Sequence, residues 1–223
     1  MRDKLIEITF AIEHENCWTS YVGNYMVRTV NFSVDSEKNY IRSIIIFDRT
    51  YKNLISRIKK SNSFLGYSTL KLDQNGRILF DFRKKFKNSV LDALYTHNGI
   101  VINGFKYNGK EFWRALVYES YINELVEDLK SKGTVHLIKN AEFNVEEEDL
   151  TPQELKIILT AYKTGYFDFP RRIKSDNVSK LVDISKSTFT YHLRSAEHKI
   201  IKRYLKEIEF YNLLKKLEEN EGA

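Results

Sequence analysis

The chain has 223 residues, of which 42% are hydrophobic and 13% aromatic, so a disordered chain is excluded and one or two folded domains are expected. Its single cysteine, Cys17, excludes an internal disulfide and suits a reducing cytoplasm, where we expect the protein to reside. No apolar run approaches the roughly 20 residues that span a bilayer, so we expect no membrane association.

The formal charge of +6 is distributed unevenly along the chain. Residues 151–206 hold twelve Lys/Arg and five Asp/Glu, whereas residues 1–150 hold 22 and 20, and residues 207–223 hold two and five. The positive excess is therefore concentrated in one C-terminal segment. Such a concentration is what the neutralisation of nucleic-acid phosphates requires.

The first two thirds of the chain alternate strand-like and helix-like patterns. We expect strands at residues 5–12, 26–34, 40–47, 66–72, 77–82, 100–107, 110–118 and 134–139, and helices at residues 50–60, 88–96 and 120–132. Asn75-Gly76 and Asn108-Gly109 are strong signals for hairpin turns. The order of elements predicts an α+β fold with an antiparallel-sheet sandwich, and two ferredoxin-like halves would account for it.

The C-terminal segment predicts a helix-turn-helix. Thr151, Pro152 and Glu154 form the pattern of a capping box, and Gly165 ends the helix that follows. A second helix fits residues 176–182, a turn fits residues 183–184, and Ser185 caps a third helix. One face of the third helix is apolar, through Phe189, Leu193, Ala196 and Ile200.

The same segment resembles the helix-turn-helix domain of the bacterio-opsin activator family of archaeal transcription regulators. The resemblance rests on residues 150–153, on the run Gly165-Tyr166-Phe167-Asp168-Phe169-Pro170-Arg171 with the residues around it, and on residues 184–188 and 192–197. It implies a sequence-specific transcription regulator that binds double-stranded DNA.

Two sets of side chains are expected to contact that DNA. The set for base edges in the major groove lies on the third helix and comprises Lys186, Ser187, Thr190, Tyr191 and Arg194. The set for phosphates comprises Arg171, Arg172, Lys174, Ser175 and Ser185. Arg194 is equally suited to a phosphate. We interpret Tyr166, Phe167 and Phe169 as core residues that anchor the loop carrying the two arginines.

The expected organisation has four parts. Residues 1–143 form a sensor or dimerisation domain, residues 144–149 an acidic linker, residues 150–206 the helix-turn-helix domain, and residues 207–223 a helical extension. Apolar positions from Ile201 through Leu217 continue the third helix. They favour a homodimer, formed through this helix or through the sheet domain. A small-molecule effector or the transcription machinery would be a further partner.

Other functional classes receive less support from the sequence. His14-x-x-Cys17 offers two ligands where a metal site needs three or four, so we expect no metal and instead a buried Cys17 beside a core Trp18. The chain lacks Gly-rich phosphate loops and nucleophile elbows, so we expect no cofactor and no enzymatic activity. We expect residues 83–87, a basic run, to be a solvated connection between strand and helix.

Two alternatives stay open. In one, the N-terminal domain is an enzyme that the helix-turn-helix localises. In the other, the protein is an RNA-binding or protein-binding module, and Phe80, Phe82, Phe105 and Tyr107 form an exposed aromatic platform. Burial of these aromatic residues is the expected outcome.

Overall fold

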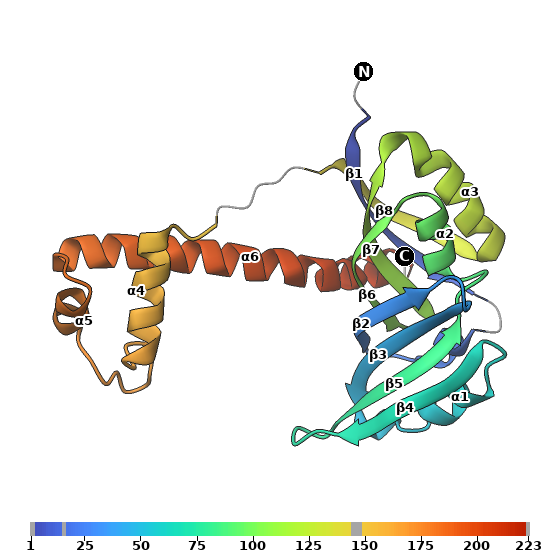
Figure 1. Ribbon diagram of the computed structural model, residues 1–223, viewed down its shortest axis with the longest axis horizontal. Coiled ribbons are helices and arrows are strands. Elements are labelled where there is room, and N and C mark those ends of the chain that lie inside the picture. Colours follow the sequence, from blue (N-terminus) through green and yellow to red (C-terminus); the bar gives the residue numbers. More distant parts are fainter. Residues whose placement is uncertain (1–2, 15–16, 144–148, 222–223) are drawn as a thin grey trace. The chain divides into compact units, whose positions relative to one another are not determined.

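The computed structural model describes residues 3–14, 17–143 and 149–221, with side-chain environments on the last helix described as far as Leu205. The chain divides into two compact units, Met1–Asn144 and Val145–Ala223 (Figure 1). The expected acidic linker lies outside the described residues apart from Asp149, as do the side chains of the expected C-terminal extension. Within the described ranges, no helix has both the length and the hydropathy needed to cross a membrane.

The first unit is built on one eight-stranded sheet with the order β4-β5-β3-β2-β6-β7-β1-β8. Every pairing between neighbouring strands is antiparallel. The strands are β1 (Leu5–Glu13), β2 (Val27–Asp35), β3 (Tyr40–Asp48), β4 (Phe64–Leu72), β5 (Arg77–Lys85), β6 (Ile100–Tyr107), β7 (Lys110–Tyr118) and β8 (Thr134–Glu142). The expected α+β class is confirmed.

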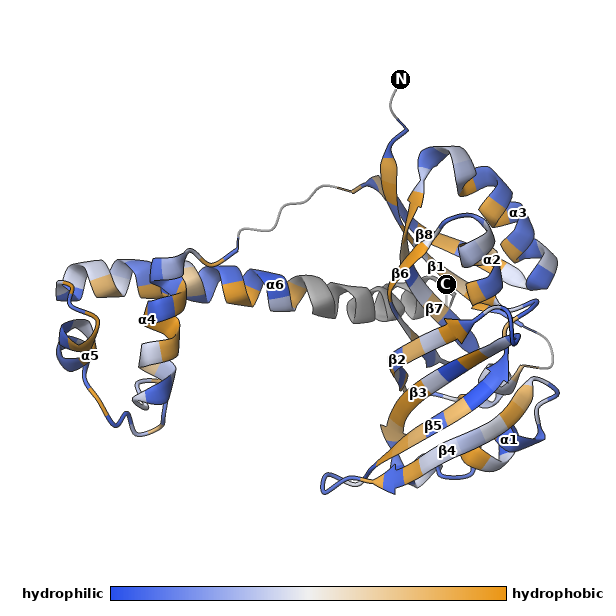
Figure 2. Ribbon diagram, in the orientation of Figure 1, coloured by the Kyte–Doolittle hydropathy of each residue, from blue (hydrophilic) through white to orange (hydrophobic). Residues whose placement is uncertain are grey.

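One layer of helices covers one face of this sheet (Figure 1). The helices are α1 (Leu54–Lys60), α2 (Val90–Thr96) and α3 (Ile122–Lys132), accompanied by the 3-10 turns η1 (Trp18–Tyr21), η2 (Arg49–Tyr51) and η3 (Glu119–Tyr121). Apolar residues alternate with polar ones along the strands (Figure 2), which gives the sheet its buried face. The helix expected over residues 50–60 is divided, because Asp48 accepts a hydrogen bond from the Thr50 amide and starts a separate turn.

Two hydrophobic cores lie beneath the helix layer. One core joins β1, β7, α2 and α3, and it includes Phe10, Leu94, Trp113, Leu125 and Leu129. The other joins β3, β5, α1 and η1, and it includes Trp18, Ile45, Ile58, Phe80 and Phe82. Most of each core therefore lies over one half of the sheet, and Ile41 of β3 extends the first core towards the other half.

The strand order reveals two ferredoxin-like halves that exchange their first strands. In chain order the unit reads as two βαββαβ repeats, β1-η1-β2-β3-α1-β4 and β5-α2-β6-β7-α3-β8. A ferredoxin-like repeat places its first strand between its third and fourth. Here β5 lies between β3 and β4, whereas β1 lies between β7 and β8. The exchange ties the halves together, because each core needs a strand from the other repeat.

The seam between the halves carries buried charge. Strands β2 and β6 pair only at Val27 with Lys106 and at Arg28 with Phe105. The Lys106 ammonium donates to Thr29 Oγ1 at 2.7 Å and lies 4.6 Å from the centre of the Trp113 ring. Burial lowers the pKa of Lys106 to about 8, although the nearby Glu111 carboxylate opposes this shift.

The negative charge at this seam is the carboxylate of Glu111, which lies opposite Lys106 on the neighbouring strand β7. It is buried and accepts a hydrogen bond from Trp113 Nε1 at 3.0 Å. Burial alone would raise the pKa of Glu111, but the charges of Lys84, His14 and Lys106 lower it to about 2. The expectation of a solvated connection at residues 83–87 was wrong, because residues 83–85 complete strand β5 and Phe86 is buried.

Candidate nucleic-acid interface

The second unit contains three helices, α4 (Pro152–Lys163), α5 (Ser175–Leu181) and α6 (Lys186–Glu221). The predicted capping box begins α4: Thr151 Oγ1 accepts from the Glu154 amide at 3.2 Å, and the Thr151 amide donates to Glu154 Oε2 at 2.8 Å. Gly165 follows α4 with φ of +74°, and a Cβ there would meet Arg172 and Asp168 atoms at 2.8 Å. Glycine is thus required where the chain leaves the helix.

The turn between α5 and α6 has the predicted form. Asp183 adopts a positive φ of 58°, and Ser185 caps α6 by accepting a hydrogen bond from the Thr188 amide at 3.1 Å. The core of the unit joins all three helices through Ile157, Ala161, Tyr166, Val178, Val182, Phe189 and Leu193. The Tyr166 and Phe189 rings meet edge to face at 5.6 Å, which fixes α6 against the end of α4.

The buried Glu154 carboxylate binds α4 to α6. Its Oε1 accepts from Ser195 Oγ at 2.6 Å, and its Oε2 accepts from Lys199 Nζ at 2.9 Å as well as from the Thr151 amide. These hydrogen bonds, with Ser195 and Lys199 first in effect, lower the pKa of Glu154 to about 2. Lys199 also donates to the Asp149 carbonyl at 3.2 Å, so the same lysine binds the chain two residues before the Thr151 cap.

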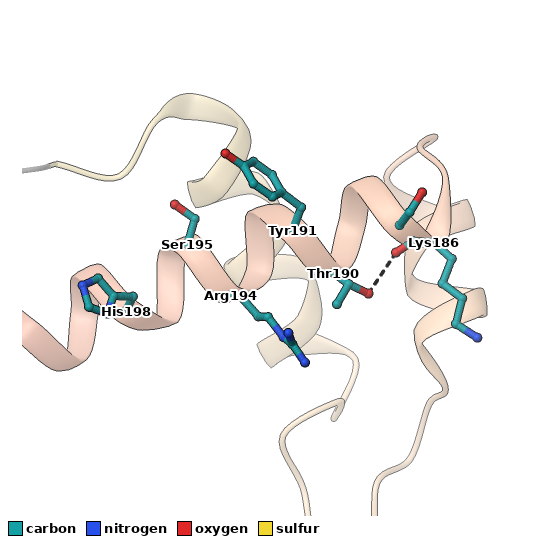
Figure 3. A pocket seen from close by; sticks show the side chains of 7 residues that line it. Lys186, Thr190, Tyr191, Arg194, Ser195 and His198 are labelled. Carbon is teal, nitrogen blue, oxygen red and sulfur yellow. Dashed lines mark hydrogen bonds between the residues drawn. The ribbon is translucent and has the colours of Figure 1, made fainter.

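The opposite side of α6 presents polar and cationic side chains along one surface. The residues that line it are Lys186, Ser187, Thr190, Tyr191, Arg194, Ser195 and His198 (Figure 3). From Lys186 to His198 the helix rises about 18 Å, which is a little over three turns. All five residues that the sequence assigned to base contacts are on this surface, and the described part of it holds no acidic side chain.

Some side chains on this surface already form hydrogen bonds or ion pairs within the protein, and others do not. Lys186 Nζ lies 3.0 Å from Asp176 Oδ1 of α5, and Thr190 Oγ1 donates to the Lys186 carbonyl at 2.9 Å (Figure 3). Ser187 Oγ lies 2.8 Å from Ser185 Oγ. Tyr191 and Arg194 are exposed, and Arg194 has no acidic partner at ion-pair distance among the described residues.

The residues assigned to phosphate contacts are divided between the loop before α5 and the cap of α6. Lys174 is exposed at the N-cap of α5, and Ser175 is the first residue of that helix. The Arg171 guanidinium lies 4.5 Å from the centre of the Tyr166 ring, and Arg172 Nε lies 2.7 Å from Asp168 Oδ2. Both arginines are exposed, so their loop presents its cations at the surface.

The aromatic residues of this loop correct one expectation. Tyr166 belongs to the core, as predicted, but Phe167 is largely exposed and Phe169 is fully exposed. The loop closes on itself, because the Arg172 amide donates to the Gly165 carbonyl at 3.1 Å and its guanidinium pairs with Asp168. Phe169 lies at the tip of that closed loop and therefore cannot reach the core.

Sequence reasoning missed two residues of the α6 surface, Ser195 and His198. His198 follows Arg194 by four positions, so helical spacing alone could have identified it. Ser195 has a second role as the donor to Glu154. A serine that joins two helices cannot be distinguished from a solvated one without the structure.

The other sites that the sequence suggested gain no support from the described residues. Phe80, Phe82 and Phe105 are buried, as expected, so they offer no exposed platform for RNA bases. Cys17 is half-buried beside the core residue Trp18, and burial raises the pKa of its thiol, which opposes thiolate reactivity. In the part of the chain that the structure describes, no three His, Cys, Asp or Glu side chains are grouped to hold a metal ion.

Comparison with known proteins identifies the C-terminal segment. Residues 150–202 match a family model described as a helix-turn-helix DNA-binding domain. The chain is 37% identical over 57 residues to the transcriptional regulator NarO of Haloferax volcanii, across 26% of this chain and 27% of that protein. It is 36% identical over 59 residues to the bacterioopsin transcriptional activator of Halobacterium salinarum, across 26% of this chain and 9% of that protein. The matched segment thus spans about a quarter or less of these relatives.

The Glu154 contacts predict a stability that depends on pH. Because folding lowers the pKa of Glu154 from 4.5 to about 2, its contribution is present above pH 4.5 and is lost as the pH falls towards 2. We expect Glu154→Gln to speed hydrogen exchange in α4 and in the part of α6 that crosses it at neutral pH. The difference from wild type should shrink below pH 4.5, after correction for intrinsic exchange rates.

Glu197→Gln is the matched control, since it removes a carboxylate from α6 at a position outside the Glu154 contacts. It should leave exchange in α4 unchanged. A Glu154→Gln effect of constant size between pH 7 and pH 3 would show that the carboxylate charge is not what joins the two helices.

Proposed function

We propose that this protein is a transcription regulator whose helix-turn-helix, of the bacterio-opsin activator type, reads duplex DNA with the exposed face of α6. The matched family and the names of the relatives support regulation by DNA binding. The observation that carries the proposal is the two-sided character of α6. One side packs Phe189, Leu193 and Ala196 into the core, and the other presents Lys186, Thr190, Tyr191 and Arg194 over about three turns.

The roles in this mechanism follow from side-chain chemistry. Residues near the beginning of a recognition helix enter the major groove most deeply, so we assign Lys186, Ser187, Thr190 and Tyr191 to base edges. Arg194 can bind the O6 and N7 atoms of guanine through two hydrogen bonds. The Lys186 pair with Asp176 is exposed, so DNA can replace it at little cost.

The exposed cations of the α4–α5 loop suit the phosphate backbone. Lys174 is free to turn towards DNA, whereas Arg172 would exchange Asp168 for a phosphate oxygen. Ser175 and Ser185 lie at the beginnings of α5 and α6, where backbone amides favour anions. Ser185 contributes through its amide, since its hydroxyl already accepts from Thr188. These contacts position the domain and carry no sequence information.

The N-terminal unit would carry the effector response or the contact with the transcription machinery. An effector can change transcription only if it binds one arrangement of the protein more tightly than another. Within this unit, a charged effector bound near the seam would change the pKa values of the buried Lys106 and Glu111 side chains, which already respond to neighbouring charges.

The base-reading role of α6 is tested by Arg194→Ala. We expect a loss of about 1–3 kcal/mol in affinity for a duplex selected from a random library, with a smaller loss on random duplex. The measurement is fluorescence anisotropy of the full chain with both duplexes. Arg203→Ala, which changes an exposed arginine on the opposite side of the same helix, is the control and should retain the preference for the selected duplex.

Equal losses on selected and random duplex would assign Arg194 to a phosphate instead. If wild type bound no duplex at any salt concentration, the proposed function itself would be wrong.

We also infer a homodimer formed through α6. Ile201 lies seven positions beyond Arg194, so it falls on the same face, and this face changes from polar to apolar after His198. Ile201 and Leu205 are exposed on this face, and Ile200 and Tyr204 are exposed on the face beside it. Apolar positions at this spacing suit pairing with a second α6, and a dimer would read two half-sites about one DNA turn apart.

Ile201→Lys combined with Leu205→Lys should convert the dimer to a monomer, because each lysine places a charge in the apolar stripe. Sedimentation velocity at micromolar concentration is the measurement, and Arg203→Gln, outside the stripe, is the control. A wild type that sediments as a monomer, or a double variant that stays dimeric, would exclude this seam.

A further inference from the structure

A second concentration of positive charge lies on the N-terminal unit, around α1. Residues 49–72 contain six Lys/Arg and no Asp/Glu. Five of these cations form the α1 patch, which comprises Arg49, Lys52, Arg57, Lys59 and Lys60. The patch carries +5 over the 12 residues 49–60, whereas residues 151–206 of the helix-turn-helix carry +7 over 56 residues.

Packing of α1 forces its cations outward. The helix has seven residues, and Leu54 and Ile58 are buried in the core that β3, β5 and η1 share. The remaining directions face solvent, and all five cations of the α1 patch are exposed. None of the five forms an ion pair within the described residues, in contrast to Lys38, Lys130 and Lys139, which pair with carboxylates.

Two cations of the α1 patch lie over the rings of exposed tyrosines. The Arg57 guanidinium lies 4.7 Å from the centre of the Tyr21 ring, and Lys59 Nζ lies 3.9 Å from the centre of the Tyr67 ring. An aromatic face holds a cation in place without neutralising its charge, so the N–H groups remain available to an anion. A solvated surface that served only solubility would mix both signs of charge.

We infer that the α1 patch binds the phosphate backbone of duplex DNA. This inference rests on the proposed function, because it extends the DNA contact from the helix-turn-helix to the N-terminal unit. Exposed cations that form no ion pair among the described residues are what a regularly spaced polyanion selects. The patch adds affinity that is independent of sequence and sensitive to salt.

A second copy of the chain is a poorer occupant of this surface. Strand β4 ends the sheet and exposes Tyr67, Leu70 and Leu72 beside α1, so it could in principle pair with another β4. Such pairing would bring two α1 patches together without any anion between them. The resulting repulsion favours a polyanion over self-association.

The test compares two triple variants with the same change in net charge. Lys52→Gln, Lys59→Gln and Lys60→Gln remove three of the five cations of the α1 patch, whereas Lys38→Gln, Lys130→Gln and Lys139→Gln remove cations elsewhere on the unit. The affinity of the full chain for a random duplex of about 40 base pairs is measured across a salt series. For the patch variant, the slope of log Kd against log salt should fall by roughly 0.9 for each phosphate that the variant no longer neutralises, up to about 2.7.

The control variant should keep the wild-type slope, and both variants should keep the wild-type preference for a selected duplex, since phosphate contacts carry no base information. A patch variant with the wild-type slope, or a control variant with an equal loss, would overturn the inference. A loss confined to single-stranded RNA would also overturn it. Failure of wild type to bind any duplex would instead contradict the proposed function.

Discussion

The buried carboxylate of Glu154 is the contact on which the exposed surface of α6 depends. It begins α4 through the capping box and joins that helix to Ser195 and Lys199 on α6. A buried carboxylate is costly unless every oxygen is satisfied, and here both oxygens accept hydrogen bonds. Phe189 and Leu193 of α6 also pack in the core of the unit, so the contacts that fix α6 lie on its inner side. Apart from Ser195, which donates to Glu154, the outward side chains of α6 take no part in the core.

Buried charge also occurs at the seam of the N-terminal unit, where it has a different consequence. Lys106 and Glu111 lie between two cores that already share exchanged strands. The short pairing of β2 with β6 leaves this seam with few backbone hydrogen bonds. A change of charge at the seam would thus act where the two halves share few backbone hydrogen bonds.

Local sequence signals predicted the second unit well because its elements are defined by neighbours in the chain. The capping box at Thr151 and Glu154, the glycine at position 165 and the Ser185 cap all act within a few residues. The strand exchange could not be predicted in this way, since alternation shows that β1 is a strand but not that β7 and β8 are its neighbours.

The wrong predictions have physical causes of the same kind. Residues 83–85 continue β5, and the charge of Lys84 there favours the buried carboxylate of Glu111 on β7, which is remote in the sequence. The residue type of Phe169 predicts a core position, but the hydrogen bond between the Arg172 amide and the Gly165 carbonyl closes its loop, and Phe169 is exposed. In both cases a contact that is remote or specific to the loop overrides residue type.

The central claim is that α6 reads base edges in the major groove, and methylation interference on a selected duplex tests it most directly. Dimethyl sulfate modifies guanine N7, which lies in the major groove. If the claim is correct, methylation of guanines within the bound site will prevent binding. Undiminished binding to duplex methylated at every guanine of the site would contradict it and would place recognition in the minor groove or on the backbone.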